Sequence, residues 1–210
     1  MKNKTRKALL LLVSSLPVAA SGESWRSHFD ADAGARPPAF FDAATLAAPG
    51  KANWIVIADF NPPSAPNQLT QTMKSRPDGS IAVALRRNVS LEDGKLSVAL
   101  KKLPSRAGLV FRMAGERDFL VLLLDGQSGQ ARLTTYRGGV PTELARGDAL
   151  LDREWGILTV SLDGATVSAR WNEKDLLRGS DPGPASGQVG LATEGTGIAA
   201  FDELVIDRKP

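Results

Sequence analysis

The sequence has 210 residues, of which 42% are hydrophobic and 23% are charged. This length and composition fit one globular domain with a sizeable core, and they argue against long disorder and against a polytopic membrane protein. The formal net charge is +3, and there is no cysteine. The lack of cysteine excludes disulfides, thiol catalysis, cysteinyl metal sites and a lipid-modified N-terminal cysteine.

Residues 1–20 have the layout of a secretory signal peptide. Four basic side chains precede the apolar run Ala8–Val13, and small residues lead up to Ala20. The apolar run is too short to span a bilayer. Cleavage after Ala20 would remove 4 of the 26 Lys and Arg residues, leaving 22 against 23 Asp and Glu, a net charge of −1. We therefore expect an exported protein, periplasmic or extracellular, with no membrane anchor and no nucleic-acid partner.

The mature chain is expected to form one structural unit over residues 21–210. Residues 21–50 are rich in Ala, Pro and Gly and predict an irregular segment with one short strand near Trp25–Phe29. Residues 51–210 alternate short apolar runs with turn signals, which is typical of an all-β sandwich or barrel, and no window keeps a helical period. The expected strands are Asn53–Asp59, Gln68–Met73, Ile81–Arg86, Lys95–Lys101, Gly108–Met113, Phe119–Leu124, Ala131–Tyr136, Thr142–Ala145, Trp155–Leu162, Ala165–Trp171, Gln188–Ala192 and Ala199–Ile206.

One Asp-Gly pair allows a prediction of register. Such pairs suit the positive φ angles of tight hairpin turns. If Asp163-Gly164 is a two-residue turn, Val160 faces Val167 and the hairpin has one wholly apolar face. Trp155 then lies on the other, mixed face, which looks outward or into a groove.

Three motifs associated with catalysis or cofactors do not fit their context. The stretch Gly195–Ala200 matches the GxGxxA letters, but only ten residues follow it and they read as a strand, so we interpret it as a turn. His28 is the only histidine and has no nucleophile elbow to serve. No strand carries alternating carboxylates of the kind that glycosidases place across a sugar bond.

Several segments, in order, resemble one group of proteins. They are FDADAGARPPAFF, NWIVIADFNPPSAPNQLTQ, EDGKLSVALKK, AGLVFR, FLVLLLD, REWGILTVSLDG, SGQVGLAT and AFDELVID. The group consists of exported bacterial proteins that are related to the 3-keto-disaccharide hydrolase domain family and, more distantly, to laminin-G-like domains. The likeness extends over roughly Trp25 to Asp207. It implies an all-β fold, a two-sheet antiparallel β-sandwich of the concanavalin A-like jelly-roll type.

The resemblance also implies site residues. It places Arg112 on the concave, ligand-facing sheet and matches Gln71 to a glutamine common in the closest group. The hydrolase family's groove-facing Glu and Gln correspond here to Leu120 and Leu122, so the obvious acid–base pair is missing. Asp202 matches an aspartate of the terminal strand.

Each of these residues has an alternative structural role. The Arg112 guanidinium suits a ligand or an ion pair with Asp118 or Glu116. Asp202 is a hydrogen-bond acceptor or a weak candidate calcium ligand, although calcium requires six to eight oxygens. We expect no cofactor, with a structural calcium as the alternative. An exposed Trp155 or Tyr136 would offer an aromatic face to a sugar.

Together these observations predict an exported module that binds a saccharide or polysaccharide on its concave sheet without catalysis, through Arg112, Gln71, Trp155 and Tyr136. The sugar preference rests on fold analogy. One alternative is a hydrolase or lyase acting on 3-keto-glycosides. The other is a structural or adhesive module that binds protein or cell-wall polymer.

Overall fold

The computed structural model describes residues 22–73, 77, 79–195 and 197–210, so the expected signal peptide lies outside the described residues. Within them the chain is built of strands, and its helical element is the 3₁₀ turn η1 (Asp30–Asp32). This agrees with the lack of a helical period in the sequence. No helix in this part of the chain is long and apolar enough to cross a membrane.

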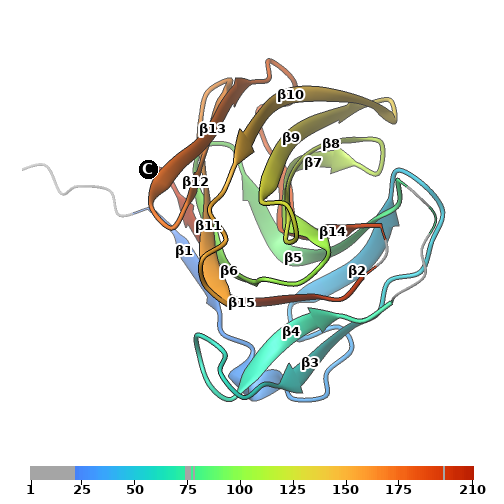
Figure 1. Cartoon of the computed structure of the whole chain (residues 1–210). Helices are drawn as coiled ribbons and strands as arrows, with labels where there is room; N and C mark the ends of the chain where they lie inside the picture. The colour runs from blue at the N-terminus through green and yellow to red at the C-terminus, as the bar shows by residue number, and fades with distance from the viewer. Residues whose placement is uncertain (1–21, 74–76, 78, 196) are drawn as a thin grey trace, which may run out of the picture.

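The strands form two antiparallel sheets (Figure 1), which confirms the expected two-sheet sandwich. Sheet A contains β1 (Ser24–Ser27), β3 (Trp54–Ala58), β4 (Asn67–Gln71), β6 (Gly94–Lys101), β11 (Trp155–Asp163), β12 (Thr166–Trp171), β13 (Lys174–Ser180) and β15 (Ala199–Arg208). Sheet B contains β2 (Phe41–Leu46), β5 (Ile81–Leu91), β7 (Arg106–Gly115), β8 (Asp118–Asp125), β9 (Gln130–Arg137), β10 (Val140–Asp148) and β14 (Gly187–Glu194). The order is β13-β12-β11-β6-β15-β4-β3 in sheet A, with β1 on β15, and β10-β9-β8-β7-β14-β5-β2 in sheet B.

The expected strands are present, and the structure adds two that the sequence pattern did not indicate, β2 and β13. Both lie at the edge of a sheet, β2 in sheet B and β13 in sheet A. Edge strands are paired on one side only and bury fewer side chains, so their apolar pattern is weak. The segment 21–50, expected to be irregular apart from one short strand, therefore also supplies an edge strand of sheet B.

The β11–β12 hairpin has the expected faces but a shifted turn. Val160 pairs with Ala169 and Leu162 with Val167, so the two residues between the strands are Gly164 and Ala165 rather than Asp163 and Gly164. Gly164 has φ 54°, the positive angle that a tight hairpin turn requires. A shift of two in the pairing keeps every side chain on its face, because the side-chain period of a strand is also two. Leu158, Val160, Leu162, Val167, Ala169 and Trp171 are accordingly buried.

Sheet B is apolar on both of its faces. Its inner face, including Leu120 and Leu122, packs against sheet A in the main core. Its outer face carries a second apolar cluster, in which no member is more than 8% exposed. In Figure 1, sheet B is curved and sheet A lies along its convex side. The outer face of sheet B is therefore the concave face of the sandwich. The cluster comprises Leu46, Ile81, Val83, Leu85, Val110, Met113, Phe119, Val121, Leu123, Tyr136 and Ala192.

Arg112 ties the two sheets together from inside the protein. It is 1% exposed and lies at a bulge of β7, where its φ is 50°. Its Nη2 donates to the Gly164 carbonyl at 2.5 Å and to the Glu92 carbonyl at 3.2 Å, and lies 3.7 Å from Asp93 Oδ1. Asp93 in turn accepts a hydrogen bond from Gly164 N–H. This corresponds to the structural alternative for Arg112, with Asp93 in place of Asp118 or Glu116.

Asp202 anchors the loop between β3 and β4. The carboxylate is completely buried and accepts hydrogen bonds from Ser64 N–H at 2.7 Å, from the Ser64 hydroxyl at 3.0 Å and from Glu203 N–H at 2.8 Å. Burial raises the pKa of Asp202 from 3.8 to about 6, although these hydrogen bonds act in the opposite direction.

We predict that Gly156→Ala destabilises the protein by about 1–3 kcal/mol through overpacking. A Cβ at position 156 would lie 2.1 Å from Trp171 Cζ2, so the buried indole would have to move. Urea unfolding of the variant and the wild type measures the difference. An unchanged free energy of unfolding would show that Trp171 has room that the structure does not indicate.

We predict that Arg112→Ala lowers the free energy of unfolding by roughly 2–4 kcal/mol, because it leaves buried carbonyl oxygens and Asp93 without their partner. Arg170→Ala is the matched control, because Arg170 forms only an exposed ion pair with Asp175 and should cost about 1 kcal/mol or less. Chemical denaturation of both variants tests this, and equal small effects would contradict the assigned role of Arg112.

Asp202 predicts a pH dependence of stability. Because its pKa in the folded protein lies above its usual value, its contribution is fully present below about pH 4 and is lost as the pH rises through about 6. The free energy of unfolding of the wild type, relative to Asp202→Asn, should therefore fall between pH 4 and pH 7, by about 3 kcal/mol at most. Denaturation curves at several pH values provide the measurement, and a difference independent of pH would contradict it.

Candidate functional site

The four residues expected to bind ligand do not share one surface. Arg112, Gln71 and Tyr136 are buried, with Tyr136 only 7% exposed, so the expected exposed tyrosine ring is not present. Tyr136 lies on the concave face of sheet B, whereas Trp155 lies on the outer face of sheet A. A single site containing all four is therefore incompatible with the structure.

Gln71 has a local structural partner. Its side chain is 0% exposed at the end of β4. Its Oε1 accepts a hydrogen bond from Met73 N–H at 2.5 Å, and its Nε2 donates to the Met73 carbonyl at 3.2 Å. Both polar ends of the amide are thus used to hold the chain where it leaves the strand.

A pocket of about 350 Å³ opens on the concave face of sheet B. Its apolar floor is formed by Val121 and Leu123 of β8, Tyr136 of β9 and Pro141 of β10. Tyr136 is stacked on Phe119, with ring centroids 4.4 Å apart and planes 12° apart. We call this the concave pocket.

The position of β8 in this pocket corrects one expectation. Leu120 and Leu122 were expected to occupy groove-facing positions, but both point into the core between the sheets. The groove-facing residues of β8 are Phe119, Val121 and Leu123, and they are also apolar.

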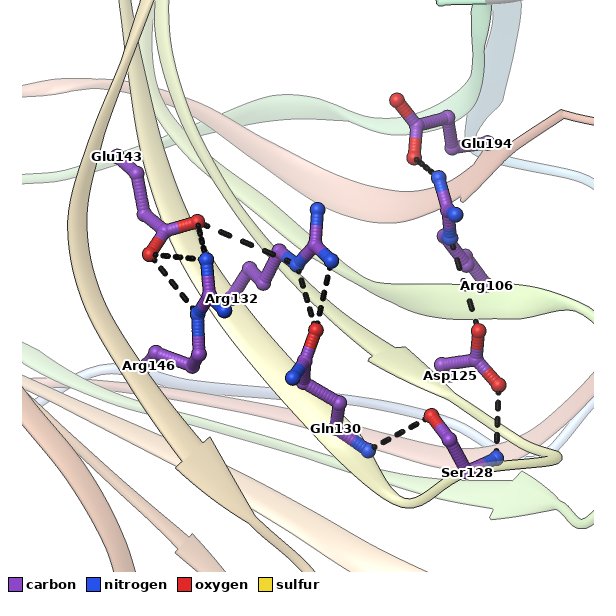
Figure 2. A network of polar contacts seen from close by, with 8 residues as sticks. All are labelled: Arg106, Asp125, Ser128, Gln130, Arg132, Glu143, Arg146 and Glu194. Carbon is purple, nitrogen blue, oxygen red and sulfur yellow. Dashed lines mark hydrogen bonds and ion pairs between the residues drawn. The ribbon is translucent and has the colours of Figure 1, made fainter.

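A row of charged side chains forms one end of the pocket rim (Figure 2). Arg106 lies between Glu194 of β14 and Asp125 of β8, its cross-strand neighbours. The Arg106 guanidinium donates to Glu194 Oε2 at 2.8 Å and lies 3.7 Å from Asp125 Oδ2. Asp125 also accepts hydrogen bonds from the backbone N–H groups of Gln127 and Ser128, both at 2.9 Å. These contacts hold both carboxylates in place.

The rim continues across β9 and β10. Arg132 donates to Gln130 Oε1 through Nε at 2.9 Å and Nη2 at 2.6 Å. Glu143 is bound by both nitrogens of the Arg146 fork at 3.0 Å and lies 4.0 Å from Arg132. Figure 2 shows this second group beside the Arg106 row, so polar groups line the rim above the apolar floor.

The protonation of the rim favours hydrogen-bond acceptance. Partial burial raises the pKa of Asp125, but its hydrogen bonds with Ser128 and Gln127 and the nearby Arg106 outweigh it, so the pKa of Asp125 lies below its usual value. Burial raises the pKa of the Tyr136 hydroxyl. At neutral pH the pocket therefore presents an ionised Asp125 and a neutral phenol.

The structure offers no fit for calcium at Asp202. The groups bonded to its carboxylate are two backbone N–H groups and one hydroxyl, from Ser64 and Glu203, whereas calcium requires six to eight oxygen ligands. Among the described residues no group of three or more His, Cys, Asp or Glu side chains is placed to hold a metal ion.

Trp155 lies in a different setting, on the outer face of sheet A, as the hairpin register predicts. The Lys101 ammonium is 5.6 Å from the centroid of the indole ring and is held by Asp59 at 2.5 Å and Glu154 at 3.2 Å. The side chain borders a second pocket, of about 640 Å³.

The charged rim of the concave pocket was not predicted from the sequence. Arg106, Asp125 and Glu194 come from the ends of three strands, and only the pairing of β14, β7 and β8 brings them together. The sequence did hold one usable signal. Phe119–Leu124 is an unbroken apolar run, which indicates a strand buried on both faces. The first polar residue after this run, Asp125, is therefore where the strand can contribute to a site.

Comparison with known proteins identifies the fold. No protein-family profile and no curated protein matches the sequence. Among solved structures, the chain is similar to the carbohydrate-binding module CBM66 from Bacillus subtilis, with a TM-score of 0.60 and 13% identity over 80% of this chain and 97% of that one.

Two further structures show the same architecture. A protein of unknown function with a galectin-like fold from Bacillus subtilis has a TM-score of 0.56 and 17% identity, over 80% of this chain and 91% of that one. A Bacillus licheniformis β-glucanase has a TM-score of 0.53 and 10% identity, over 92% of this chain and all (100%) of that one. At these identities the likeness concerns the fold, and the chain is a jelly-roll sandwich of the concanavalin A-like and galectin-like kind.

Proposed function

We propose that this protein is an exported saccharide-binding module that holds its ligand in the concave pocket without catalysis. The observation that carries this proposal is the combination of an apolar floor around Tyr136 with a rim of fixed carboxylate, guanidinium and amide groups. Export is part of the proposal and rests on the signal-peptide layout of residues 1–20.

The chemistry of the pocket complements a sugar ring. A sugar presents apolar C–H faces and a circumference of hydroxyl groups, so it needs an apolar surface and surrounding hydrogen-bond partners. Tyr136, Leu123 and the exposed Pro141 supply the surface, and Glu194 and Asp125 supply oxygen acceptors. The Oε1 of Gln130 already accepts from Arg132, so its amide N–H groups are donors for a ligand. Hydrogen bonds from hydroxyls to ionised carboxylates are stronger than those between neutral groups.

The state of the carboxylates supports binding over hydrolysis. A glycosidase requires one carboxylic acid that is protonated at working pH, which means a raised pKa. The pKa of Asp125 is lowered, and Glu194 is hydrogen-bonded to Arg106. The ionised Asp125 is therefore suited to accept hydrogen bonds rather than to donate a proton.

A hydrolase acting on 3-keto-glycosides remains the second candidate, because two carboxylates do flank Arg106 in one pocket. The structural neighbours include a carbohydrate-binding module and a β-glucanase, which supports a saccharide ligand for either candidate. Incubation with 3-keto-glycosides under the conditions of the binding assay separates the two candidates, because turnover would favour the hydrolase.

We predict that Glu194→Gln weakens saccharide binding in the concave pocket about tenfold, because one charge-assisted hydrogen bond is lost. The measurement is calorimetric titration with tetra- to hexasaccharides of glucose, xylose, mannose, galactose and fructose. Glu116→Gln is the matched control, because it removes the same charge from an exposed residue outside the pocket. Equal affinities for all three proteins would contradict the assigned site, and a wild type that binds no saccharide would contradict the function.

A further inference from the structure

The outer face of sheet A carries a second pocket that the proposed site does not use. It is bordered by Trp155 and Arg153, by Glu203, and by residues 61–63 of the β3–β4 loop. It adjoins a groove of about 990 Å³ along β6, β11, β12 and β13, since Ser97, Ile157 and Asn172 line both. We call it the Trp155 pocket.

One buried carboxylate fixes two walls of the Trp155 pocket. Asp202 accepts hydrogen bonds from Ser64 N–H, next to residues 61–63, and from Glu203 N–H. Glu203 has φ 51°, a left-handed conformation that non-glycine residues adopt at an energetic cost and that is often found at functional sites. His28 Nδ1 lies 3.2 Å from Glu203 Oε1. The fold therefore fixes the backbone of Glu203, and its carboxylate lies next to His28.

The aromatic wall is equally fixed. Lys101, held by Asp59 and Glu154, lies over the indole ring of Trp155. The indole N–H is buried and has no hydrogen-bond partner within the described part of the chain. Ile157 lies beside the pocket with 53% of its surface exposed, which adds apolar area to the wall.

The polar groups of the pocket suit a sugar. Arg153 is exposed and takes part in no ion pair among the described residues, so its donors are available. Asn172 uses its Oδ1 to accept a hydrogen bond from Ile157 N–H at 2.8 Å, which leaves its amide donors for a ligand. An aromatic wall, a carboxylate, a guanidinium and an amide are the groups that bind hydroxyls around an apolar ring.

We propose that the Trp155 pocket is a second saccharide-binding site, so that one protein molecule holds two glycan chains on opposite faces. This inference rests on the proposed function, because both pockets take the same class of ligand. The sheets of a sandwich pack about 10 Å apart, and their outer faces point in opposite directions. A short oligosaccharide therefore occupies one pocket at a time, whereas polysaccharide chains become cross-linked.

The test is the stoichiometry of binding, measured by calorimetry with the same panel of tetra- to hexasaccharides. We expect two oligosaccharides per wild-type molecule and one per molecule of Trp155→Ala. Glu203→Gln keeps the shape of the pocket and should weaken the same site about tenfold. Glu194→Gln should affect the other site alone. Thermal melting of each variant verifies that it is folded, and turbidity with a soluble polysaccharide should appear with the wild type and not with Trp155→Ala.

The outcomes separate the two proposals. One oligosaccharide per wild-type molecule, lost in Glu194→Gln and unchanged in Trp155→Ala and Glu203→Gln, would overturn the second site and leave the proposed function intact. Binding that depends on Trp155 and Glu203 but not on Glu194 would overturn both the concave pocket and the idea of two sites. A wild type that binds none of the panel would overturn both proposals.

Discussion

The burial of sheet B on both faces is the constraint on which the rest of the structure depends. Its inner face packs against sheet A, while its outer face packs within its own curl. A strand such as β8 must therefore be apolar at every position, and Phe119–Leu124 satisfies this requirement. Because apolar side chains fill the centre of the concave face, the polar groups of the pocket come from strand ends, from β9 and from the edge strand β10.

The concave pocket follows from that constraint. Where the apolar run of β8 ends, Asp125 begins a polar rim that continues through Arg106 to Glu194. The rim groups compensate one another in charge, so each is held in place without a ligand. A pocket that is arranged before the ligand arrives loses less conformational entropy on binding, which is the physical advantage of building it on paired strands rather than on loops.

Two buried polar groups perform related tasks at other places in the sandwich. Arg112 joins the β5–β6 and β11–β12 turns from within, and Asp202 fastens the β3–β4 loop to β15. Both lie at a β-bulge. Arg112 itself has a positive φ, and Asp202 precedes Glu203, which has one. A bulge redirects a side chain out of the regular alternation. It thereby lets a polar group reach backbone partners, which a buried charge requires. The sequence analysis left a structural role open for both, beside a ligand contact for Arg112 and a weak calcium ligand for Asp202.

The sequence by itself determined the fold class, most of the strands and the faces of the β11–β12 hairpin, because turn signals and apolar alternation are local properties with a period of two. It also singled out Tyr136 and Trp155 as aromatic side chains that border pockets. Only the tertiary structure decided that these two lie on opposite faces, that Arg112 and Gln71 are buried, and that Arg106, Asp125 and Glu194 meet. The physical reason is that strand order and the positions of bulges are set by long-range pairing, and local patterns do not encode which strands become neighbours.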